Sequence, residues 1–165
     1  MGKAATAPKD IFMQFAAVVV GFDGADTTNL VSASLATGLS LRAGLIWLIH
    51  KIEWEVGLNI CTANAGFRGA LSVRAGLTVI PQRHQDGVLD ALAHHGSCGG
   101  GLQQYEHAFF PPIPLAAASI NIYARTSANV AQAVDDETAV RIGFTTAPLD
   151  AQTYQEIAET WGYVG

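Results

Sequence analysis

The residues most capable of chemistry lie in one stretch, HHGSCGGGLQQYEHAFFPPIP, which begins at His94. His94, His95 and Cys98 could supply three ligands to a metal ion, with His107 as a fourth. Structural zinc sites carry paired, closely spaced ligands on both sides of a loop, whereas the second side offers only one histidine here. The two adjacent histidines would also point apart on a helix. The pattern therefore favours a helix end and a surface loop over a metal site.

Other chemical interpretations of the sequence are weaker. The run GSCGGG matches neither phosphate-binding glycine motif, and no lysine follows it. Its three consecutive glycines indicate freedom to turn. Cys98, next to glycines and near histidines, could act as a nucleophile. A serine nucleophile is not indicated, because no serine lies in a G-x-S-x-G motif. His50 and Glu53 come closest to the ligands of a cupin-like metalloenzyme, yet residues three apart in a strand point to opposite faces. We therefore predict no catalytic, cofactor-binding or metal-binding residues, and a protein that is not an enzyme.

The segment FFPPIP at 109–114 has a different character. Its three prolines enforce an extended backbone, and two phenylalanines precede them. One interpretation is a stiff connector that leaves a long loop and crosses the end of a sandwich. The other is an apolar contact surface for a neighbouring subunit. On the second interpretation, the candidate subunit-interface residues are Phe109, Phe110, Pro111 and Pro112.

The composition points to a single domain with apolar material to spare. Half of the 165 residues are hydrophobic, only 14% are charged, and the net charge is −5. This excess predicts burial against other copies of the chain, and the charge lacks the basic footprint of a nucleic-acid binder. Two cysteines are too few for a disulfide framework. We expect a flexible arm at 1–9, without a secretory signal, and one domain at 10–165.

Alternating apolar residues predict most of the elements. The expected strands lie at 10–20, 29–37, 45–56, 67–80, 115–126 and 138–146, and the expected short helices at 85–95 and 150–161. Asp150 is the expected N-cap of the second helix. In the strand at 45–56, one face is expected to be buried throughout: Ile46, Leu48, His50, Ile52, Trp54 and Val56. Strands and helices do not alternate, so we predict a mostly β protein, an antiparallel β-sandwich of the single jelly-roll type, with one or two short helices including a C-terminal one.

Three segments carry a resemblance to a known family. They are ATGLSLRAGLIWLIHKIEWEV, AAASINIYARTSAN and the ending VRIGFTTAPLDAQTYQEIAETW. Their order resembles that of small single jelly-roll capsid proteins of tailless icosahedral viruses. The resemblance implies a subunit that self-assembles into an icosahedral shell with copies of itself and other capsid proteins. It also implies a place in the virion after synthesis in the host cytoplasm.

One departure from such capsids concerns the genome. The first ten residues hold only Lys3 and Lys9 as cations, not the arginine-rich arm that neutralises phosphate. We therefore expect little direct nucleic-acid binding, and a shell that encloses a membrane vesicle or leaves the genome to a separate basic protein.

Two alternatives from other classes stay open at the level of the sequence. One is a jelly-roll binding module, for example for carbohydrate, with Trp47, Trp54 or Tyr123 as an aromatic platform. The other is a small metal-dependent enzyme built on the histidines and the cysteine of the opening stretch. Core packing is the favoured interpretation of the tryptophans.

Overall fold

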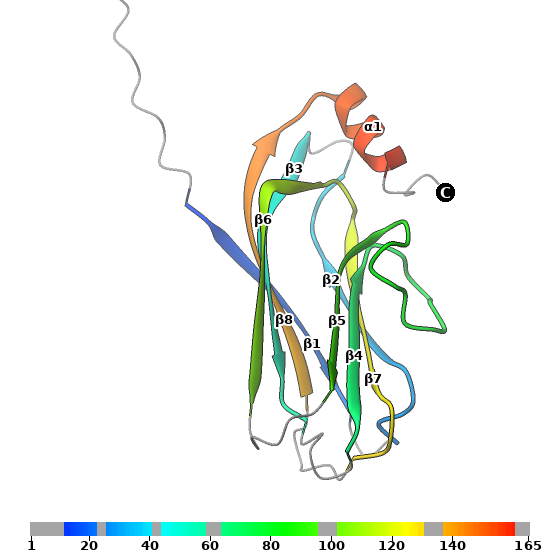
Figure 1. Ribbon diagram of the computed structural model, residues 1–165. Coiled ribbons are helices and arrows are strands. Elements are labelled where there is room, and N and C mark those ends of the chain that lie inside the picture. Colours follow the sequence, from blue (N-terminus) through cyan, green and yellow to red (C-terminus); the bar gives the residue numbers. More distant parts are fainter. Residues whose placement is uncertain are drawn as a thin grey trace, which may run out of the picture.

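The computed structural model describes residues 12–22, 26–40, 44–58, 64–95, 102–130 and 137–160. Within them the chain forms eight strands and one helix, which Figure 1 shows as two facing layers with the helix at one end. The elements are β1 (Gln14–Gly21), β2 (Val31–Ala36), β3 (Leu45–Val56), β4 (Gly66–Ser72), β5 (Val88–His95), β6 (Gln103–Leu115), β7 (Ser119–Thr126), β8 (Glu137–Pro148) and α1 (Ala151–Thr160).

The strand order identifies the fold. One sheet has the order β1-β8-β3-β6 and the other β2-β7-β4-β5, and every pair is antiparallel. Strands pair first with last, second with seventh, third with sixth and fourth with fifth, as in one long hairpin wrapped into two layers. An eight-strand sandwich of this kind is a jelly roll. The predicted fold class is therefore confirmed, with one described helix at the C-terminal end.

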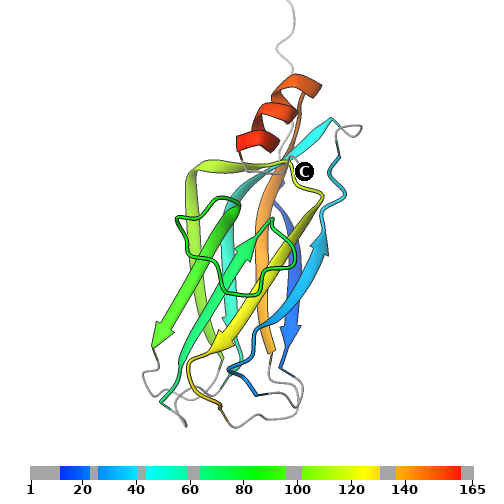
Figure 2. The same ribbon diagram turned by 90° about the vertical axis from the view of Figure 1, so that its right-hand side faces the viewer.

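The core lies between the two sheets. Figure 2 shows these sheets after a quarter turn from Figure 1. The largest fully buried side chains of the core come from both layers: Trp54, Phe22, Phe67, Ile49 and Ile52. Removing this apolar surface from water is the main favourable term in folding. A smaller second cluster lies under α1, where Tyr154 packs with Ile46 and Ala116.

The predicted face of β3 is correct for only half of the strand. A β-bulge between Ile49 and Lys51 shifts its register against both neighbouring strands. Ile52, Trp54 and Val56 face the main core as expected, but before the bulge Trp47 and Ile49 do so instead. One extra residue moves every later side chain to the other face, so Ile46 packs under α1. The sequence alternates without a break and gives no sign of the bulge.

Two further predictions of secondary structure are wrong. The expected helix at 85–95 is strand β5, in which a bulge brings Leu89 and Leu92 to the same core. Their separation of three residues imitates helical spacing. The expected strand at 67–80 ends at Ser72, and Gly76, with a φ of 68°, lies in the loop that follows.

The C-terminal helix begins as predicted. Asp150 caps it by accepting a hydrogen bond of 2.8 Å from the Thr153 backbone N–H. The Tyr154 hydroxyl donates to the Ala116 carbonyl and fixes the helix on the end of the sandwich. In the part of the chain that the structure describes, no helix is long and apolar enough to cross a membrane. The predicted arm at 1–9 lies outside the described residues, as do Cys61 and Cys98.

Candidate subunit interface

The segment FFPPIP forms a corner in strand β6. The prediction of a long loop before this segment is wrong from Gln103 onward, because strand β6 begins there and includes the segment. Ala108 pairs with Lys51 and Ile113 with Ile49, so residues 109–112 stand opposite one residue of β3. The strand consequently bends sharply at the end of the sandwich, at the top of Figure 1. β6 is the edge of its sheet, where prolines are tolerated because they donate no ladder hydrogen bond.

The four predicted interface residues differ in exposure. The Phe110 side chain is fully exposed at 101% of its reference area, whereas Phe109 is partly buried against the main core. Pro111 is exposed and Pro112 is half-buried. Phe109 therefore anchors the corner while Phe110 and Pro111 face outward. Their role in subunit contact stays a prediction.

His50 lies in β3 where β6 turns its corner. It is half-buried, and its Nε2 is 2.9 Å from the Thr145 hydroxyl of β8. Glu53 lies on the outer face of the same sheet and pairs with Lys51 and Arg141. The two side chains therefore have separate partners.

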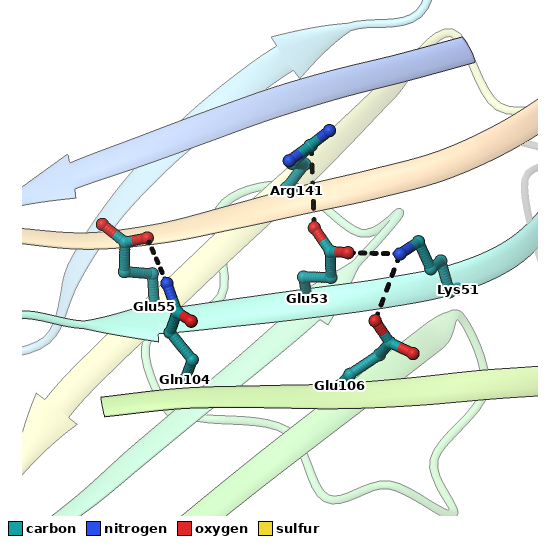
Figure 3. Close-up of polar contacts among 6 residues, drawn as sticks. All are labelled: Lys51, Glu53, Glu55, Gln104, Glu106 and Arg141. Atoms are coloured by element: carbon teal, nitrogen blue, oxygen red, sulfur yellow. Dashed lines mark hydrogen bonds and ion pairs between the residues drawn. The ribbon is translucent and has the colours of Figure 1, made fainter. Parts of the chain in front are cut away.

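The outer face of the sheet β1-β8-β3-β6 carries a network of charges, shown in Figure 3. Lys51 is paired with Glu53 and lies 3.1 Å from a Glu106 carboxylate oxygen. Arg141 Nε lies 3.6 Å from the other Glu53 oxygen. The hydrogen bond from Lys51 lowers the pKa of Glu53, and the same bond raises the pKa of Lys51. These strands also line a shallow hollow of about 440 Å³.

An apolar strip adjoins this network along β1 and the two residues before it. It consists of four large side chains with substantial exposure: Phe12 at 79%, Met13 at 42%, Phe15 at 45% and Val19 at 45%. The Arg141 guanidinium lies 3.9 Å from the Phe15 ring centroid, which is a cation–π distance. The strip was not singled out from the sequence, because a strand rich in valine and phenylalanine is typical of a buried position.

Two histidines of the opening stretch, His94 and His107, lie in polar bridges between β5 and β6. His107 Nδ1 is 2.7 Å from an oxygen of the fully buried Asp90, and that oxygen also accepts a 2.8 Å hydrogen bond from Trp54 Nε1. His94 Nδ1 is 2.6 Å from the Tyr105 hydroxyl. Among the described residues, no group of three or more such side chains is placed to hold a metal. The bridges instead connect the two sheets along one side of the sandwich.

Asp90, a buried carboxylate with two polar partners, was not predicted from the sequence. Its carboxylate has no exposed area, and Arg83 Nη2 lies 3.1 Å from the second oxygen, outside hydrogen-bond geometry. A single charged residue inside the apolar run VLDALA was the available signal. Buried carboxylates require partners, and the partners come from segments remote in the sequence.

The aromatic residues considered for a binding platform are all buried, the two tryptophans in the core between the sheets. Trp54 is exposed by 1%, Tyr123 by 2% and Trp47 by 7%. Trp47 stacks on Phe144 with ring centroids 3.8 Å apart. These positions confirm core packing and contradict the aromatic platform.

Comparison with known proteins gives structural neighbours only. No family model matches the sequence, and no curated protein matches it. A structure of Desmodium yellow mottle tymovirus is similar with a TM-score of 0.37 and 13% identity, over 90% of this chain and 89% of that one. An unassembled pentamer of a mutant VP1 from Washington University polyomavirus has a TM-score of 0.38 and 10% identity, over 87% of this chain and 98% of that one.

Both of these neighbours are viral proteins. The superpositions are loose, so the fold is assigned from the strand order and not from these similarities.

Proposed function

We propose that the chain is a viral capsid subunit that self-assembles into an icosahedral shell and resides in the virion, after synthesis in the host cytoplasm. The observation that carries the proposal is the corner of β6, which holds Phe110 entirely in solvent. A monomer gains nothing from an exposed phenylalanine at a rigid bend, whereas a neighbouring subunit can bury it. The jelly roll is compatible with this role, because viral capsid domains are among the proteins that have this fold.

The alternatives find less support in the described residues. A carbohydrate-binding module would need aromatic rings in solvent beside polar groups, and the three rings considered for it are buried. A metal-dependent enzyme would need converging ligands, and His94 and His107 lie in separate bridges to Tyr105 and Asp90. We therefore propose a structural protein without catalytic activity.

The proposed partners are copies of this chain and other capsid proteins. The outer network of charges holds three carboxylates (Glu53, Glu55 and Glu106), and its two cations, Lys51 and Arg141, are paired with Glu53 and Glu106. It therefore offers phosphate no excess of positive charge. We accordingly propose little direct binding to the genome, with an internal membrane or a separate basic protein beneath the shell. Lipid analysis of purified particles tests the last point: particles free of lipid, with this chain as their only protein, would contradict it.

The proposed assembly is tested with the purified full chain by light scattering and negative-stain imaging. We expect pentamers, hexamers or shells, and smaller species for Phe110→Ser. Burying a phenylalanine contributes about 1.5–3 kcal/mol, so each contact should weaken roughly tenfold to a hundredfold. Leu102→Ser is the matched control, since Leu102 is also exposed, by 56%, but lies at the other end of β6.

Either of two results would contradict the proposal. A wild-type chain that stays monomeric at all concentrations, alone and with its co-purified partners, contradicts self-assembly. An assembly that tolerates Phe110→Ser as well as Leu102→Ser shows that the corner is not an interface.

A further inference from the structure

The two edge strands of the first sheet are protected very differently. β6 carries three prolines and a corner, and it is bridged to β5 by Asp90 and His107. β1 at the opposite edge reads QFAAVVVG, with no charge and no proline. In the part of the chain that the structure describes, β1 pairs only with β8. Its other edge therefore presents a row of backbone donors and acceptors, the arrangement that recruits a further strand.

The side chains of β1 add to this open edge. Phe15 and Val19 of the apolar strip are each 45% exposed on the outer face, with the exposed Ala17 between them. β2, the neighbouring edge of the second sheet, is shorter and exposes Ser32 and Ser34. The edge of β1 is thus the longer and more apolar of the two, and its occupant should be an extended, uncharged segment.

We propose that β1 pairs antiparallel with β1 of a second copy, so that two four-stranded sheets join into one across a two-fold axis at Ala17. Opposed residues in such a pair must face the same side of the sheet. With Ala17 opposite itself, Phe15 lies opposite Val19 of the partner, and the contact occurs twice. Aromatic and β-branched side chains form favourable cross-strand pairs. A shift of this register by two residues puts Phe15 opposite Gly21 or Ala17 instead.

Charge does not oppose this arrangement. The charged residue of β8 nearest the axis is Arg141, which pairs with Ala17 in the sheet and is held by Glu53 and the Phe15 ring. Two copies of Arg141 would be separated by three strand spacings, roughly 14 Å. That distance exceeds the screening length of about 8 Å at physiological salt. Because the pairing needs a second copy but not a shell, it is independent of the proposed function.

Single cysteines on β1 test the pairing and its register in the full-length chain with Cys61→Ser and Cys98→Ser. Ala17→Cys places two thiols opposite each other, at a Cα separation of roughly 4.5–5.5 Å that a disulfide spans. After mild oxidation we expect a shift from the 17.3 kDa band to one of twice that mass. The chain with Phe15→Cys alone should keep the lower mass, whereas the chain with both Phe15→Cys and Val19→Cys should shift to the higher mass. Ser34→Cys on β2 is the exposed control and should stay at the lower mass.

The outcomes separate the possible occupants of the edge. Dimers formed equally by Phe15→Cys and Ala17→Cys would show random collision and overturn the proposal. The absence of a dimer at position 17 would overturn it too, and would favour another segment, such as residues 1–11, beside β1. A second variant guards against misfolding: Ala17→Lys opposes two ammonium groups at the axis and should abolish the pairing seen by light scattering. Ser34→Lys should leave it intact, and retention of the pairing by Ala17→Lys would count against the proposal.

Discussion

Gly69 of β4 lies where the core leaves no room for a side chain. A Cβ at this position would stand 2.6 Å from Trp54 Cζ3 and 3.0 Å from Phe67 Cε1. Trp54 cannot retreat freely, because it is 1% exposed and its Nε1 donates to Asp90 over 2.8 Å. Gly69→Ala therefore forces either a displaced indole ring or a shifted strand.

The magnitude follows from two opposing effects. Overpacking of a dense core costs about 1–3 kcal/mol. Replacing a glycine by alanine restores about 0.4–1 kcal/mol by restricting the unfolded chain. We expect Gly69→Ala to lower the free energy of unfolding by roughly 1–2 kcal/mol, which is about 2–8 °C in melting temperature for a domain of this size.

A double-mutant cycle with Trp54→Phe isolates the contact. Phenylalanine lacks the ring atoms that the new Cβ would meet, so Gly69→Ala should cost less in that background, by about 0.5 kcal/mol or more. The loss of the Trp54 hydrogen bond is common to both Trp54→Phe variants and cancels. Urea unfolding of all four chains in the same oligomeric state is the assay. The reasoning is refuted if Gly69→Ala is as stable as the wild type, or if its cost is equal in both backgrounds.

Two other perturbations address the polar contacts. Asp90→Ala should lower the free energy of unfolding by about 1–3 kcal/mol, because it leaves the buried Trp54 N–H without an acceptor. Asp90→Asn keeps an acceptor oxygen and should cost less. Equal losses of stability for the two variants in urea unfolding would contradict this account. The hydrogen bond from Lys51 lowers the pKa of Glu53 in the folded chain. Ionised Glu53 therefore stabilises the fold fully above the carboxyl pKa of the unfolded chain, about 4.3. This contribution is lost as the pH falls through the lower pKa of the folded chain. Glu53→Gln should therefore flatten the acid side of a plot of melting temperature against pH, and curves that run parallel would argue against it.

Predictions from the sequence succeeded where a local pattern is sufficient. The strand at 45–56 and the cap at Asp150 were identified with their correct bounds and role, because alternation and capping depend on residues close in the chain. The helix expected at 85–95 failed because a bulge beside Leu89 gives a strand helical spacing. Bulges are fixed by the partner strand, which the local pattern does not contain.

The candidate site shows the same division. The sequence singled out Phe110 together with Phe109, Pro111 and Pro112 as a candidate interface, and the structure shows that Phe110 is the fully exposed member. The open edge of β1 was not foreseen, since a valine-rich strand looks equally buried whether it lies at the centre or the edge of a sheet. Its place beside β8 depends on residues more than a hundred positions away.

The sequence by itself determined the fold class, the C-terminal helix and the apolar, proline-rich character of residues 109–114, because composition, periodicity and capping act over a few residues. Only the tertiary structure decided which strands form the edges, which half of β3 faces which core, and that Asp90 joins His107 and Trp54 between the sheets. Those features arise from pairing between distant segments. Each depends on a partner's register and burial, and neither quantity is a property of the local sequence.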